Sequence, residues 1–109
     1  MALHHAAEGE VVDLATWDED TASGGTKAIV KTDNLELIRL TLSPQREMDT
    51  HQVAGPSVIH CLDGRIVVDA MGKSEELGPG QLMHLAPNEP HAVRAREESH
   101  ALLTVMFIR

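Results

Sequence analysis

Most of the chain consists of short segments rich in Val, Ile, Leu and Thr. Residues typical of turns separate these segments at intervals of about 8–12 residues. This rhythm is typical of an all-β sandwich or barrel. The pattern predicts strands near residues 27–32, 35–42, 46–53, 57–62, 65–70, 73–77, 81–86, 91–96 and 101–108. We expect hairpin turns at 31–34, 62–64 and 71–73, because Asp, Asn and Gly tolerate the left-handed backbone that such turns need.

One segment has an alternative interpretation. Residues 92–103 (AVRAREESHALL) contain good helix formers and could form a helix by propensity alone. The residues that continue this segment, 102–108, fit better as a strand that is buried on both faces. We therefore favour a strand, a turn near residues 97–99 and a second strand.

The first 25 residues differ from the rest and are interpreted as an arm, with a barrel domain over residues 26–109. Residues 10–14 could form a short edge strand, whereas residues 18–25 are rich in Asp, Thr, Ser and Gly and favour a loop. Residues 1–26 hold six acidic residues and no Lys or Arg. The simplest interpretation of this acidic arm is a solvated segment.

Length and composition exclude several classes of protein. With 109 residues, 42% of them hydrophobic, and a net charge of −8, the chain is expected to be one soluble globular domain. It has no apolar run of about 18–20 residues for a membrane span and no basic stripe for nucleic acid, and we do not expect a secretory signal. Cys61 is the only cysteine, so an intrachain disulfide is impossible and a cytoplasmic location is expected.

Two segments are apolar on both faces, residues 35–42 and residues 102–108. A strand of this kind needs cover on both sides, and a chain of this size leaves one side open unless another subunit packs there. We therefore expect a homodimer.

Two short patterns indicate the family. The first is His51-x-Val53-x3-Ser57-x6-Gly64, and the second is Gly80-x5-Ala86-x-Asn88-x2-His91. Their spacing resembles the two motifs of the cupin superfamily, G-x5-H-x-H-x3-E-x6-G and G-x5-P-x-G-x2-H-x3-N, in a small single-domain member. The resemblance implies a double-stranded β-helix, a jelly-roll-like barrel that carries a metal in many cupins.

Half of the implied metal ligands are replaced. His51 and His91 occupy two histidine positions of the motifs, whereas Val53 stands at a third and Ser57 stands at the glutamate position. Asn88 replaces a glycine, which is compatible with a left-handed turn. A valine cannot bind a metal, so the resemblance supports the fold more strongly than the metal.

Asp49 could complete the set. It lies two residues before His51 and would share a face with it on a regular strand. Two histidines and one carboxylate suit non-haem iron, and a divalent metal at His51, His91 and Asp49 could be Fe, Mn, Ni or Zn. The alternative for Asp49 is a solvated strand end.

Two further histidines, His60 and His84, are expected on the outer face, where they are candidates for the dimer contact, and Cys61 is expected in the core. The expected ligand pocket comprises His51, Val53, Ser57, Met83, Leu85 and His91. Our leading hypothesis is a barrel that binds a small molecule, with metal absent or weakly held. The alternatives are a metal-dependent enzyme, dioxygenase-like or isomerase-like, that uses His51 and His91, and a structural role involving the arm. The sequence does not decide whether the protein is an enzyme.

Overall fold

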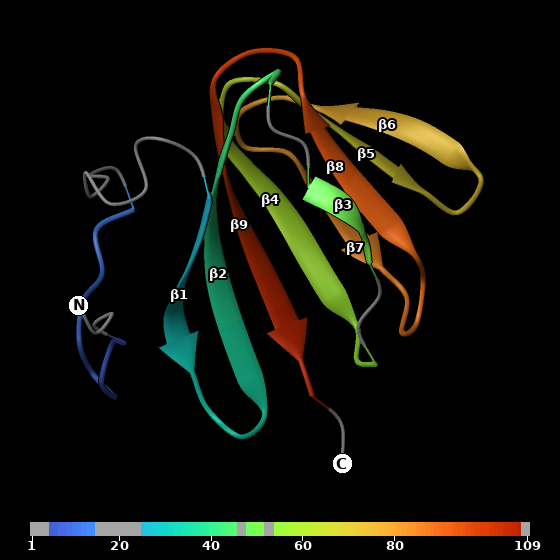
Figure 1. Cartoon of the computed structure of the whole chain (residues 1–109). Helices are drawn as coiled ribbons and strands as arrows, with labels where there is room; N and C mark the ends of the chain where they lie inside the picture. The colour runs from blue at the N-terminus through green and yellow to red at the C-terminus, as the bar shows by residue number, and fades with distance from the viewer. Residues whose placement is uncertain (1–4, 15–24, 46–47, 52–53, 108–109) are drawn as a thin grey trace.

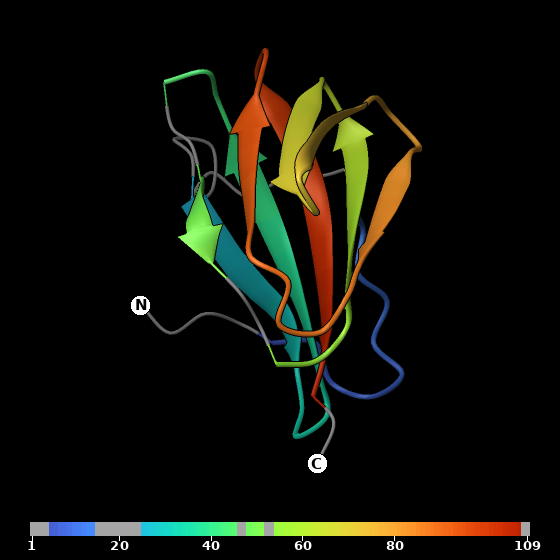
Figure 2. The same ribbon diagram turned by 90° about the vertical axis from the view of Figure 1, so that its right-hand side faces the viewer.

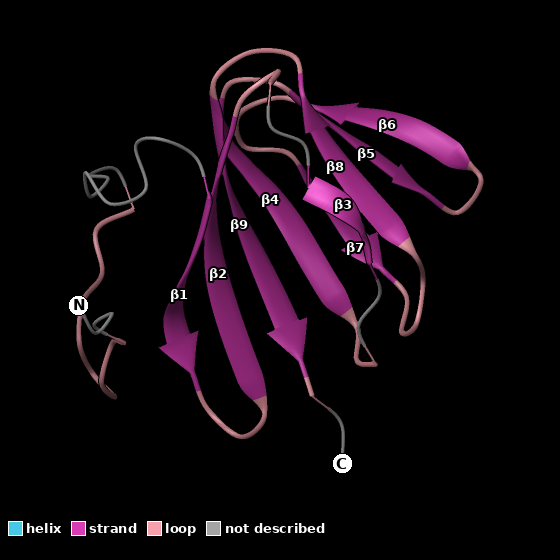
Figure 3. Cartoon of the chain, viewed as in Figure 1, coloured by secondary structure: helices cyan, strands magenta, loops and turns pink. Residues whose placement is uncertain are grey.

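The protein is built from two antiparallel β-sheets that face each other (Figure 1). The structure, a computed structural model, describes residues 5–14, 25–45, 48–51 and 54–107, with the side chains of residues 48–51 outside the description. The strands are β1 (Gly25–Lys31), β2 (Leu35–Leu42), β3 (Met48–His51), β4 (Ser57–Asp63), β5 (Ile66–Ala70), β6 (Lys73–Leu77), β7 (Leu82–Leu85), β8 (His91–Ala95) and β9 (Ser99–Met106). The described residues include no helix (Figure 3).

The chain passes back and forth between the two sheets. The larger sheet has the strand order β1-β2-β9-β4-β7 and the smaller sheet has the order β3-β8-β5-β6. Figure 2 shows the smaller sheet in front of the larger one. This arrangement of crossing connections is the double-stranded β-helix that the motif spacing implied.

Strict alternation of side chains creates the core between the sheets. Along β4 and β9 every second side chain is buried, and the residues between them are only partly covered. Directly opposite residues such as Ile59 and Leu103 share the inner face, because antiparallel partners project to the same side of a sheet. The core cluster is therefore apolar and draws residues from both sheets.

The expected strands are confirmed, with shifts of at most two residues at their ends. Residues 92–103 form a strand, a turn and a strand, and the helical alternative is wrong. The burial of alternate residues in β8 and β9 outweighs their helix propensity. The turns are also confirmed, and Asn88 has the expected left-handed backbone with φ of 62°.

Residues 10–14 of the arm form no strand, so the expected edge strand is wrong. A turn closes instead between Ala7 and Glu10, where the Glu10 amide donates to the Ala7 carbonyl. Hydrogen bonds join the described part of the arm to the larger sheet. The Ala6 amide donates to the carbonyl of Ile29 in β1, and Arg39 Nη2 donates to the carbonyl of Asp13 at 3.3 Å.

Within the described residues, no helix has the length and apolar character to cross a membrane.

Candidate functional site

One end of the barrel gathers several of the residues that the motifs singled out. Leu85 ends β7 in the larger sheet and His91 begins β8 in the smaller sheet, so the loop of residues 86–90 crosses between the sheets here. Ser57 begins β4 and pairs with Leu85. His51 ends β3, and its backbone pairs directly with that of His91. The topology therefore brings four of the expected pocket positions to the same end.

The described side chains among them are buried inside the barrel. Ser57 is 2% exposed, Leu85 is 0% exposed and His91 is 1% exposed. Met83 is partly buried and packs against the core cluster. The Ser57 hydroxyl has no hydrogen-bond partner among the described residues, although its oxygen is fully buried. A hydroxyl in this condition loses its hydration without replacing it.

The imidazole of His91 is held by a backbone carbonyl. Its Nδ1 lies 3.1 Å from the carbonyl oxygen of Glu89, which can only accept a hydrogen bond. Nδ1 therefore carries the proton in this contact, and in the neutral ring Nε2 carries the lone pair. Nε2 is buried within the barrel.

The metal hypothesis depends on residues that the structure describes only in part. Val53 and the side chains of Asp49 and His51 lie outside the described residues. The β3–β8 register shifts between Met48, which pairs with Val93, and His51, which pairs with His91. This bulge inserts one extra residue in β3, so simple alternation does not carry from Asp49 to His51. Among the described side chains, no three His, Cys, Asp or Glu residues gather as metal ligands.

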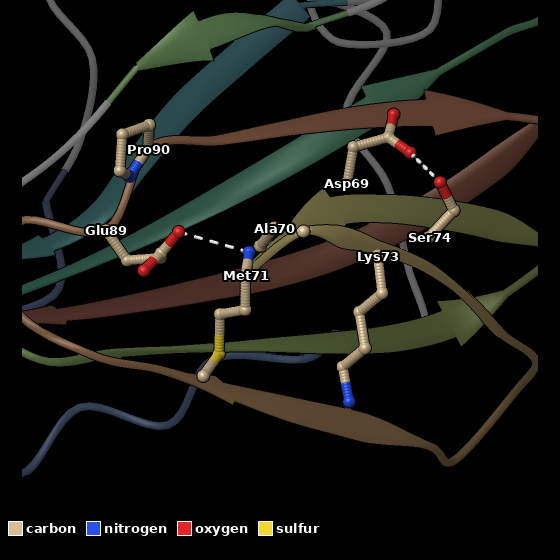
Figure 4. A pocket seen from close by; sticks show the side chains of 8 residues that line it. Asp69, Ala70, Met71, Lys73, Ser74, Glu89 and Pro90 are labelled. Carbon is tan, nitrogen blue, oxygen red and sulfur yellow. Dashed lines mark hydrogen bonds between the residues drawn. The ribbon is translucent and has the colours of Figure 1, made fainter.

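A shallow polar pocket lies beside this end, between the β5–β6 hairpin and the 86–90 loop (Figure 4). Glu89 Oε2 accepts a hydrogen bond from the Met71 amide at 3.0 Å and ties the loop to the hairpin. Asp69 accepts two hydrogen bonds from Arg94, at 2.8 and 3.0 Å, and one from Ser74. The Arg94 and Ser74 hydrogen bonds lower the pKa of Asp69 to about 2, so its carboxylate is charged at neutral pH.

Sequence reasoning missed Lys73, which also lines this pocket. Lys73 pairs with Ala70 in the hairpin, and Ala70 pairs with His91 on its other side. The expected turn at residues 71–73 contained the necessary signal, because a two-residue turn at Met71 and Gly72 pairs the residues on either side of it.

The remaining candidates do not face this pocket. His60 pairs with Leu82 and Leu102, and His84 pairs with Val58. Because side chains alternate along each strand, these residues lie on the outer face of the larger sheet. Their expected outer position is confirmed. Cys61 is fully buried, as expected for a core residue, and burial raises the pKa of its thiol.

Comparison with known structures agrees with the fold. A conserved protein of unknown function from Streptococcus pyogenes has a TM-score of 0.79 at 20% identity, covering 100% of this chain and 97% of that one. A cupin superfamily protein from Desulfitobacterium hafniense DCB-2 has a TM-score of 0.78 at 14% identity, covering 99% and 100%. KdgF from a Halomonas species has a TM-score of 0.72 at 16% identity, covering 99% and 96%. These identities show a common fold only.

Sequence comparison gives the family. No curated protein matches the chain. The family model described as the cupin domain matches residues 38–107, which include both motifs and every strand from β3 to β9. The chain therefore belongs to the cupin family.

Proposed function

We propose that this cupin binds a small molecule at the end of the barrel formed by Ser57, Leu85 and His91, with metal absent or weakly held. His51, Val53 and Met83 complete the proposed pocket. The observation that carries the proposal is the buried Ser57 hydroxyl, which has no hydrogen-bond partner among the described residues. Apolar sites with a few polar groups are the usual form of small-molecule pockets.

The two polar groups offer complementary chemistry to a ligand. Ser57 can donate or accept a hydrogen bond, whereas His91 Nε2 accepts one when Nδ1 is bonded to Glu89. The surrounding side chains, such as Leu85 and Val105, are apolar and buried. This environment favours a compact ligand with one hydroxyl or carbonyl group directed at the two residues.

A thermal-shift screen of small metabolites tests the proposal on the wild type and two variants. We expect at least one compound to raise the melting temperature, because binding to the folded state alone stabilises it. Ser57→Ala should lose most of that shift. Thr41→Val is the matched control, since Thr41 also has a buried hydroxyl without a partner among the described residues. Thr41 lies in β2, however, at a position paired with the outward-facing His100, so it does not face the proposed pocket.

Two outcomes would contradict the proposal. One is a library in which no compound stabilises the wild type. The other is a ligand whose effect survives in Ser57→Ala as fully as in Thr41→Val.

The second candidate is a metal-dependent enzyme, dioxygenase-like or isomerase-like, that uses His51 and His91. Direct pairing of the two histidine backbones favours it, as does the carbonyl that fixes Nδ1 of His91, a common arrangement around metal ligands. The two residues would hold a divalent metal, which supplies Lewis-acid chemistry when bound. Stoichiometric metal that disappears in both His51→Ala and His91→Ala would support this candidate, and metal unaffected by either substitution would reject it.

We also infer a homodimer that forms through the outer face of the larger sheet. Leu82 is 58% exposed on this face, next to the partly exposed side chains of Val58, His60 and Leu102. An apolar sheet face of this kind is a suitable isologous interface.

The single thiol in a chain without disulfides supports a cytoplasmic location, which cell fractionation would test.

A further inference from the structure

Lys73 belongs to the same cross-strand row as His91. In the smaller sheet, Lys73 pairs with Ala70 and Ala70 pairs with His91. Directly opposite residues of antiparallel strands project to the same face, and adjacent strands lie about 4.8 Å apart. The Cα atoms of Lys73 and His91 are therefore separated by about 10 Å, or two strand spacings.

The residue between Lys73 and His91 is small and lines the pocket. The Ala70 side chain is a single methyl group, so it does not extend far above the sheet. A lysine side chain is long and flexible, so the Lys73 ammonium can reach the region above Ala70 that adjoins His91. Figure 4 shows Lys73 and Met71 on one side of the hairpin, with Asp69 and Ser74 on the other.

The charges of the pocket favour an anion at Lys73. Both carboxylates that line it are already engaged, Asp69 by Arg94 and Ser74, and Glu89 by the Met71 amide. The Lys73 side chain is exposed, and its ammonium makes no hydrogen bond or ion pair with any residue that the structure describes. Its ammonium is thus the group in this pocket available for an acidic ligand.

We propose that Lys73 binds the carboxylate of a small monoanionic acid whose remaining atoms occupy the barrel beside His91. This inference rests on the proposed function and adds the class of ligand. A single negative charge fits better than two, because Lys73 is the one cation among the described residues that line the pocket, and the carboxylates of Asp69 and Glu89 repel additional charge.

Isothermal titration calorimetry with matched acids and amides tests this assignment. The probes are lactate, butyrate and benzoate, each beside its amide, which keeps the shape and removes the charge. We expect at least one acid to bind the wild type about tenfold or more tightly than its amide, because a charge-assisted hydrogen bond contributes more than a neutral one. This preference should weaken as salt concentration rises.

Substitutions separate Lys73 from other sources of charge. Lys73→Met should abolish the preference for the acid, whereas Lys73→Arg should retain it. Lys31→Met is the control, since Lys31 is also an exposed lysine but ends β1 in the other sheet. It should leave acid and amide binding unchanged.

The outcomes distinguish the two proposals. If metabolites bind in a Ser57-dependent way but the three acids bind no better than their amides, or bind equally to Lys73→Met, the carboxylate assignment is wrong and the proposed function stands. If neither the acids nor any library compound binds the wild type, both are wrong.

Discussion

Two glycines with nearly the same backbone conformation lie in different surroundings. Gly64, which follows β4, has φ of 79°, and Gly72, in the β5–β6 turn, has φ of 75°. A Cβ atom on Gly64 would lie 2.5 Å from the Glu98 carbonyl oxygen and 2.7 Å from the Ser99 Cα. A Cβ atom on Gly72 would have no neighbour within 4 Å. Position 64 therefore requires glycine for two reasons: the backbone is left-handed, and there is no room for a side chain.

The substitutions Gly64→Ala and Gly72→Ala should therefore differ in cost. We expect Gly72→Ala to lower the free energy of unfolding by about 1 kcal/mol, from backbone strain alone. Gly64→Ala should lower it by roughly 2–5 kcal/mol, because backbone atoms must also move away. Urea unfolding of both variants measures the difference. Equal losses would show that the space around Gly64 is not restrictive.

The sequence was informative at single residues where backbone conformation decides the residue type. Gly64 and Asn88 were expected in left-handed turns and both are found there. It was less informative where a side chain depends on tertiary contacts. No local signal indicates that the Ser57 hydroxyl lacks a partner among the described residues, or that the β3 bulge interrupts alternation between Asp49 and His51.

At the scale of elements, the β5–β6 hairpin contains an unfavourable residue in its turn. Met71 and Gly72 form the two-residue connection, and both have positive φ, with Met71 at 56°. Turns of this type strongly prefer Asn or Asp followed by Gly. A methionine in the left-handed region costs about 1 kcal/mol of stability. The Met71 side chain is 55% exposed, so its burial offsets little of this cost.

Met71→Asn should consequently stabilise the protein. We expect an increase of about 0.5–1 kcal/mol in the free energy of unfolding, because Asn tolerates the left-handed backbone. The Met71 amide that donates to Glu89 is retained in this variant. Met71→Ala is the control and should give little or no gain, since alanine keeps the backbone strain. A gain in Met71→Ala as large as in Met71→Asn would mean that the strain is not the cause.

Elements with one buried face were predictable, and irregular ones were not. The strands β4, β8 and β9 alternate between buried and partly exposed residues. In β9, Leu102 is partly exposed and Met106 is 43% exposed, although the sequence favoured a strand buried on both faces here. Residues 10–14 have apolar content but contact the sheet through the Asp13 carbonyl rather than through a strand ladder. Composition alone cannot distinguish these two ways of covering a sheet.

At the scale of the whole molecule, the proposed dimer makes a clear prediction for Leu82. A charge at this exposed apolar position would be buried in an isologous interface, once from each subunit. Leu82→Asp should therefore weaken dimerisation by about tenfold or more, as measured by sedimentation equilibrium. Val11→Asp is the control, because Val11 is 91% exposed on the arm, and it should remain dimeric.

A monomeric wild type at micromolar concentration would reject the dimer. So would equal dissociation of both variants.

The position of β9 has a consequence for how the protein is made. β9 is the last strand of the barrel, yet it lies at the centre of the larger sheet between β2 and β4. During synthesis, β2 and β4 therefore emerge from the ribosome long before the strand that joins them, with their inner edges open to other chains. The larger sheet can close only after residue 106 has left the ribosome, so the nascent barrel depends on late, long-range pairing and is most vulnerable to aggregation just before completion.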